Sequence, residues 1–101
     1  MGGRMSRSKG LRGEREVFKA WEAAGGVVLN LDGQGDHLVE LNDVIYHVEC
    51  KRAEHLRIPE WLRQAEREAA QPFYVPNVCW RRNGEPWFIA MRLGTFLEVA
   101  K

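Results

Sequence analysis

Residues 37–51 have the sequence HLVELNDVIYHVECK, and this stretch decides the fold. Two strand-like runs, 37–41 and 44–51, predict two β-strands. Asn42 and Asp43 separate the runs, and both residue types tolerate the left-handed backbone conformation of a two-residue hairpin turn. We therefore predict an antiparallel hairpin over 37–51.

The second strand of this hairpin carries different chemistry on its two faces. Because side chains alternate along a strand, one face holds Val44, Tyr46, Val48 and Cys50, and the other holds Ile45, His47, Glu49 and Lys51. The first face is apolar and belongs in a core. The second ends with a carboxylate and an ammonium group, those of Glu49 and Lys51, which project side by side from the end of the strand.

The hairpin also brings a second carboxylate to Glu49. If Leu41 faces Val44 across the turn, the same register places Asp36 directly opposite Glu49, with Cβ atoms roughly 5 Å apart. Two like charges at that distance repel each other unless a cation lies between them. Magnesium keeps water molecules for a substrate phosphate, so one Asp, one Glu and a backbone carbonyl would be enough to hold it. The pattern predicts a Mg²⁺ site in which Lys51 orients a water molecule or stabilises the developing anion.

Further elements surround the hairpin. Helical spacing predicts one helix from Lys9 to about Ala24, ended by Gly25-Gly26, and a second helix over 59–70. Short strands are predicted at 27–29, 73–80 and 87–91, and a last helix at 95–100. The order α-β-β-β-α-β-β-α predicts an α/β fold with a mixed central sheet of about five strands, flanked by helices. Residues 1–8, which have no periodicity, predict a flexible basic arm before a single domain at 9–101.

Composition limits the class of protein. A chain of 101 residues and 11.7 kDa has room for one domain, and 45% hydrophobic with 29% charged residues is typical of a globular chain. The sequence has no run of about 18 apolar residues that could cross a membrane, and its start lacks the apolar stretch of a signal peptide. Cys50 and Cys79 are too few for a disulfide scaffold, which favours a reducing cytoplasm.

Charge is distributed unevenly along the chain. The formal net charge is +1, which argues against a histone-like polycation, yet the first fifteen residues hold five Lys or Arg against Glu14 alone. Glu14 either completes the metal shell, directly or through water, or forms an ordinary surface salt bridge, and spacing does not decide between the two. Zinc is not indicated, because the Cys and His residues lack CxxC or HxxxH spacing.

The ordered set of motifs resembles the PD-(D/E)XK nuclease superfamily. The resemblance is carried by SKGLRGEREV at 8–17, by Gly35-Asp36 and by VECK at 48–51, and it extends from about Ser8 to Arg57 and more faintly to the C-terminus. The chain is most similar to archaeal-type Holliday-junction resolvases, including their phage-borne relatives. Gly35 stands where the superfamily name has Pro, a position that varies.

The resemblance implies a restriction-endonuclease-like core, so that 9–101 would form one nuclease domain. It implies Asp36, Glu49 and the main-chain carbonyl of Cys50 as metal ligands, Lys51 as the catalytic lysine and Glu14 as the first-helix acidic residue. The implied cofactor is Mg²⁺, for which Mn²⁺ is expected to substitute, with no small-molecule cofactor. A homodimer in the cytoplasm, or in the host cytoplasm for a phage protein, is also implied, since a four-way junction needs two symmetric cuts.

These observations predict a metal-dependent, structure-specific DNA endonuclease that resolves four-way (Holliday) junctions by paired incisions through phosphodiester hydrolysis. Basic residues are expected to contact the branched DNA: Arg4, Arg7, Lys9, Arg12, Arg15, Arg52 and Arg57. One alternative is another small nuclease of the same superfamily, of restriction or repair-nicking type. A non-catalytic nucleic-acid-binding module is the other alternative, but it leaves the grouping of Asp36, Glu49 and Lys51 unexplained.

The aromatic residues of the C-terminal third predict where two copies of the chain would contact each other. Several of the ten aromatic residues lie within 73–96, on two short strands and one short helix. They cannot all face inward, so some must be exposed or pack against another copy of the chain. We therefore predict a dimer interface in this third.

Overall fold

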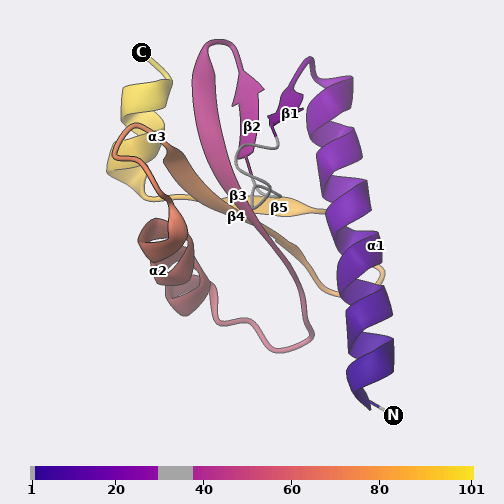
Figure 1. The fold of residues 1–101 in the computed structure, drawn as a ribbon. Helices are drawn as coiled ribbons and strands as arrows, with labels where there is room; N and C mark the ends of the chain where they lie inside the picture. Colours follow the sequence, from indigo (N-terminus) through magenta and orange to yellow (C-terminus); the bar gives the residue numbers. More distant parts are fainter. Residues whose placement is uncertain (1, 30–37) are drawn as a thin grey trace.

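The computed structural model describes residues 2–29 and 38–101, and for residues 2–12 it describes the backbone alone. Figure 1 shows the elements in chain order: α1 (Gly2–Ala23), β1 (Val27–Leu29), β2 (Leu38–Leu41), β3 (Val44–Arg52), α2 (Ile58–Glu68), β4 (Val75–Arg81), β5 (Phe88–Ala90) and α3 (Leu93–Val99). The predicted order of helices and strands is confirmed. The ends of most elements differ from the prediction by only a few residues.

The strands form one five-stranded mixed sheet in the order β1-β2-β3-β4-β5. Strands β1, β2 and β3 are antiparallel neighbours, β3 and β4 are parallel, and β5 is antiparallel to β4. A parallel pair cannot be joined by a tight turn, so the chain leaves the sheet after β3 and returns through α2 (Figure 1). The predicted α/β class is therefore confirmed.

The β2–β3 hairpin has the predicted turn and register. Asn42 and Asp43 have φ angles of 53° and 65°, the left-handed values that a two-residue turn of this type requires. Leu41 pairs with Val44, and the register continues to the pair of Leu38 with His47. Asp36, which the same register would place opposite Glu49, lies outside the described residues.

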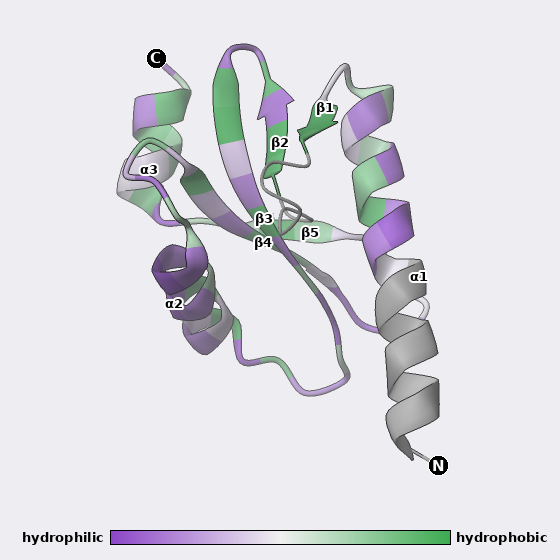
Figure 2. Ribbon diagram, viewed as in Figure 1, coloured by the Kyte–Doolittle hydropathy of each residue, from purple (hydrophilic) through white to green (hydrophobic). Residues whose placement is uncertain are grey.

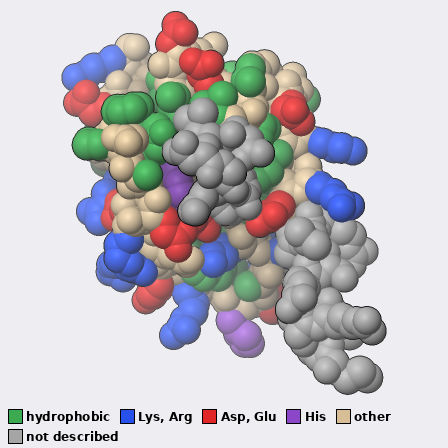
Figure 3. Space-filling model, viewed as in Figure 1, with side chains coloured by type: hydrophobic (Ala, Val, Ile, Leu, Met, Phe, Trp, Pro, Cys, Tyr) green, Lys and Arg blue, Asp and Glu red, His purple; other side chains and the backbone are tan. Residues whose placement is uncertain are grey.

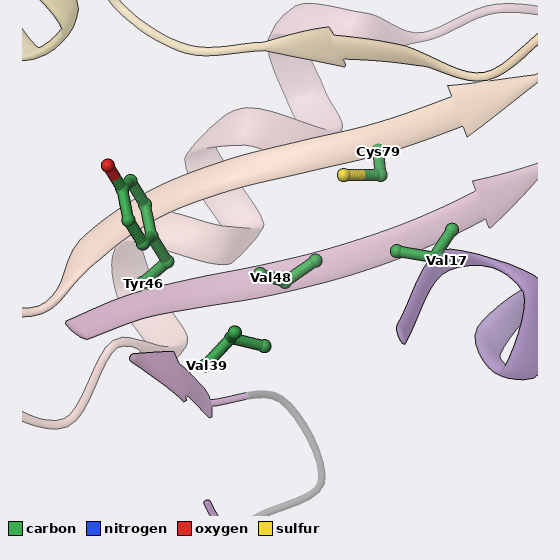
Figure 4. Close-up of a cluster of buried hydrophobic side chains, with 5 residues drawn as sticks. All are labelled: Val17, Val39, Tyr46, Val48 and Cys79. Atoms are coloured by element: carbon green, nitrogen blue, oxygen red, sulfur yellow. The ribbon is translucent and has the colours of Figure 1, made fainter. Parts of the chain in front are cut away.

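A hydrophobic core covers one face of the sheet. Its buried members come from α1, β2, β3 and β4, and Figure 4 shows them together: Val17, Val39, Tyr46, Val48 and Cys79. The half-buried Cys50 also packs against this cluster. The even-numbered face of β3 is thus the core face, as its sequence predicts. Figure 2 shows hydrophobic residues in β1, in much of β2 and in the first part of β3, and also on α1 and α3.

Helix α2 covers the opposite face of the sheet. Its Ala65 is fully buried, as is Val78 of β4, which pairs with Glu49 on that face. Glu68, at the end of α2, lies close to His47 and Glu49 of β3. The odd-numbered side chains of β3 therefore lie between the sheet and α2, whereas the even-numbered ones face the core.

Helix α1 starts earlier than predicted and ends where predicted. It begins at Gly2 instead of Lys9, so the segment 2–8 expected as a separate arm belongs to the helix. That segment contains no proline to end a helix. At the other end Gly25 has a φ of +100°, and the N–H of Gly26 donates to Trp21 O at 2.8 Å, the Schellman arrangement that ends α-helices.

Helix α3 returns to the core face and leaves part of its own surface open. Its Val99 packs against the core cluster, and Arg92, just before the helix, donates to Glu66 of α2 at 2.9 Å. The Arg92 guanidinium lowers the pKa of Glu66, mainly through this hydrogen bond. Among the described residues, no helix has the length and apolar character needed to cross a bilayer.

Candidate functional site

Glu49 is a buried carboxylate in the middle of the sheet. It lies on β3, on the face turned towards α2, and is only 6% exposed. His47, also 6% exposed, is the preceding residue on the same face, and its Nε2 lies 3.1 Å from Glu49 Oε1. Burying a carboxylate is costly unless it has hydrogen-bond donors or a cation as partners. The sheet therefore holds a polar pair where a purely structural strand would hold apolar side chains.

A second carboxylate joins this pair from α2. One potential ligand atom each of His47, Glu49 and Glu68 lies within 4.8 Å of the others, and Glu68 also accepts a hydrogen bond from Gln64 at 3.0 Å. Glu68 was not predicted from the sequence, because only the crossover through α2 brings it near β3. His47 was predicted to lie on the face of Glu49, but no role was predicted for it.

Lys51 follows at the end of the same face. It is half-buried, and within the described part of the chain no carboxylate lies within salt-bridge distance of its ammonium group. Its neighbour on β4 is Trp80, whose ring stacks on Phe88 of β5 with centroids 4.8 Å apart. The prediction that Glu49 and Lys51 share one face is confirmed by the strand's alternation, and that face continues into an aromatic pair at the sheet edge.

Helix α1 lies against the other side of β3. A Cβ at Gly13 would lie 3.6 Å from Cys50 Sγ and 3.4 Å from Trp87 Cη2, so the helix backbone comes close to the strand here. Burial, together with the negative charges of nearby groups, Glu14 among them, raises the pKa of the Cys50 thiol to about 12. Glu14 is therefore near the Cys50 end of β3, although it does not belong to the His47–Glu49–Glu68 group. Its role as a metal ligand stays a prediction.

A cluster that the sequence did not predict holds α1 at this position. The indole Nε1 of Trp87 donates to Glu16 Oε2 at 2.9 Å, and the Arg81 guanidinium lies 3.5 Å from the same oxygen. Arg81 also lies over the Trp87 ring, 5.4 Å from its centroid. These contacts join α1 to β4 and to the segment before β5, and so fix the helix that carries Glu14.

The predicted DNA-binding residues are distributed over several elements. Arg15 is exposed on α1, and Arg57 is exposed just before α2. Arg52 is half-buried, and its Nε donates to Asn83 Oδ1 at 3.3 Å. The remaining predicted residues are in α1, with side chains outside the described residues: Arg4, Arg7, Lys9 and Arg12. Figure 3 shows acidic and basic side chains interspersed on the visible face, and this view shows no single continuous basic patch among the described residues.

The donor set in the described residues partly fits a divalent cation. Carboxylate oxygens are the ligands that magnesium prefers, and Glu49 supplies one in a largely water-excluded position. The Cys50 side chain packs on the core face, and in the described part of the chain neither thiol belongs to the His47–Glu49–Glu68 group. Comparison of the chain with protein-family models, with curated proteins and with solved structures gives no match.

Proposed function

We propose that the chain is a metal-dependent DNA endonuclease that resolves four-way junctions by paired incisions through phosphodiester hydrolysis. The observation that carries the proposal is the odd-numbered face of β3, where a buried carboxylate, Glu49, is followed two residues later by a lysine. Support also comes from the β2–β3 register, which follows the sequence prediction as far as Leu38. A buried carboxylate needs hydrogen-bond donors or a cation as partners, and a metal ion beside Glu49 would be one such partner.

The residues of the proposed site comprise metal ligands and one cationic side chain. Asp36, Glu49 and the main-chain carbonyl of Cys50 would hold Mg²⁺, and Mn²⁺ would take its place. When bound, the metal would neutralise charge on the phosphate and make a coordinated water more acidic. The Lys51 ammonium group would stabilise the negative charge that develops during hydrolysis or orient the attacking water. Glu14 would complete the metal shell from α1, directly or through water.

The substrate would be recognised through its backbone and shape. The position of a branch in DNA is not tied to sequence, so contacts to phosphates serve this activity better than contacts to base edges. The exposed guanidinium groups of Arg15 and Arg57 suit such contacts. The two free cysteines suit a reducing cytoplasm, where we place the activity.

We further propose that two copies of the chain act together. The C-terminal third exposes large apolar side chains, as its composition predicts: Phe73, Phe88, Ile89, Leu93, Phe96 and Leu97. An apolar groove of about 450 Å³ lies beside α3, between Tyr46, Ile89 and Phe96. Exposed apolar surface of this kind is typical of an interface, and a two-fold axis would present two equivalent sites to the opposed strands of a junction.

Three substitutions test the proposed site. Glu49→Gln, Asp36→Asn and Lys51→Ala should each abolish cleavage of a four-way junction, because two remove a metal ligand and the third removes the cation beside the phosphate. Binding to the junction, measured in Ca²⁺ to prevent cleavage, should remain within a few-fold of wild type, since phosphate contacts supply the affinity. Glu60→Gln, at an exposed position of α2, is the control and should cleave normally. Cleavage at the wild-type rate by any of the three variants would disprove the assignment.

The dimer is tested separately by analytical ultracentrifugation at micromolar concentration. Wild type should sediment with twice the monomer mass of 11.7 kDa. Phe96→Glu places a charge in the exposed apolar surface and should yield monomers, whereas Glu98→Gln on the same helix should not. A wild-type protein that stays monomeric with and without junction DNA would contradict the paired-incision scheme.

A further inference from the structure

We propose that His47 is a positioning residue of the site proposed above: its Nε2–H holds the Glu49 carboxylate in the orientation that binds the metal. This inference rests on the proposed nuclease function and adds a residue to it. The observation behind it is the 3.1 Å contact between His47 Nε2 and Glu49 Oε1, with both side chains only 6% exposed.

The direction of the hydrogen bond follows from the chemistry of the two groups. An ionised carboxylate can only accept hydrogen bonds, so a contact with an imidazole nitrogen requires that Nε2 carries the hydrogen. A metal ligand must be ionised, and Glu49 therefore acts as the acceptor in the competent state. The contact engages Oε1, and a metal needs only one carboxylate oxygen, so the hydrogen bond and metal coordination are compatible.

The strand geometry explains why His47 can do this for Glu49. Residues two apart on a strand point to the same side, so the imidazole lies beside the carboxylate without any loop having to fold over it. The surroundings are also restricted, because α2 covers this face and brings Glu68 to within 4.8 Å of both ligand atoms. A donor in a fixed position limits which rotamers the Glu49 side chain can adopt. Outer-shell hydrogen bonds of this kind typically change metal affinity about 10- to 100-fold when they are removed.

Metal binding by the full-length protein tests the proposal without relying on activity. The probe is Mn²⁺, titrated by isothermal calorimetry into wild type, His47→Ala and His47→Gln. His47→Ala should weaken Mn²⁺ binding about 10- to 100-fold. His47→Gln should stay within about fivefold of wild type, because its side-chain amide also offers an N–H donor at a similar reach. Thermal unfolding checks that the variants fold, and if His47→Ala does not fold, His47→Leu, which also lacks a hydrogen-bond donor but fills more of the space, takes its place.

Two further variants separate positioning from direct coordination. His55→Ala removes the other described histidine, which is exposed, and should bind Mn²⁺ as wild type does. Glu68→Gln removes the charge of the exposed carboxylate of the group and should lower the affinity less than His47→Ala does, because solvent screens that charge. If His47→Gln and Glu68→Gln are both as weak as His47→Ala, the two residues ligate the metal themselves, and a positioning role is wrong.

Junction cleavage then separates this inference from the function on which it rests. The Mg²⁺ concentration for half-maximal cleavage should rise in His47→Ala by the factor measured for Mn²⁺ binding, with the rate largely recovered at saturating metal. If wild type and His47→Ala bind Mn²⁺ and cleave the junction equally well, the role proposed for His47 is wrong and the nuclease function stands. A wild type that neither binds Mn²⁺ nor cleaves overturns the nuclease function and this inference with it.

Discussion

Val48→Ala should cost about 2.5 kcal/mol of unfolding free energy. Val48 is fully buried on the core face of β3, directly between Glu49 and His47 in sequence. Removing two methyl groups loses about 1.6 kcal/mol of transfer free energy. The cavity left behind adds about 1 kcal/mol if it amounts to roughly 40 Å³. Because small domains have only about 5–15 kcal/mol in total, the loss is readily measured.

Urea unfolding followed by tryptophan fluorescence measures this loss, and Val27→Ala serves as its control. Val27 lies in β1 but is 55% exposed, so its truncation should cost less than about 1 kcal/mol. In thermal unfolding the Val48 variant should melt about 10–20 °C lower than wild type. Equal losses for the two variants would refute the assignment of the even-numbered side chains of β3 to the core. The same result would remove the reason for placing Glu49 and Lys51 together on the opposite face.

Three other features give predictions of their own. Gly26→Ala should destabilise the protein by about 1–3 kcal/mol in urea unfolding, because its Cβ would lie 2.8 Å from the Trp21 carbonyl oxygen; an unchanged midpoint would contradict the helix end described above. Burial raises the pKa values of Cys50 and Cys79 to about 12 and about 11, so at pH 8 a disulfide reagent should label the native thiols at least about 100-fold more slowly than the unfolded ones. The stability that these neutral thiols provide should be complete below about pH 8.5 and be lost as the pH rises towards 11 and 12. A native thiol that reacts as fast as an unfolded one would show that the thiols are not buried. Deleting residues 1–7 should flatten the salt dependence of junction binding by about 0.9 log unit per lost phosphate contact, and an unchanged slope would exclude this segment from the DNA interface.

The fold was predictable from local features of the sequence. The Asn42-Asp43 turn sets the register of the hairpin, and alternation then assigns every side chain of β3 to a face without knowledge of the rest of the chain. Gly25 and Gly26 similarly mark the end of α1. The start of α1 was mispredicted because residues 2–8 have no apolar periodicity, whereas the absence of proline lets the helix continue.

The candidate site was only partly predictable. The shared face of Glu49 and Lys51 follows from strand alternation, which is a local property. Glu68 reaches the site through the β3–α2–β4 crossover, and Glu16 meets Trp87 only because α1 packs beside the last hairpin. Contacts of this kind depend on how elements that are distant in the sequence pack together, and residue spacing does not predict that packing.

Cleavage of a four-way junction by the wild-type protein in Mg²⁺ tests the central claim most directly. The substrate is a junction of fixed branch position, and the comparison is with linear duplexes made of the same sequences. We expect paired, symmetric incisions near the branch, no cleavage in EDTA, and cleavage of the duplexes that is at least about 100-fold slower. Absence of metal-dependent cleavage would contradict the nuclease function, and cleavage of junction and duplex at equal rates would contradict the specificity for branched DNA.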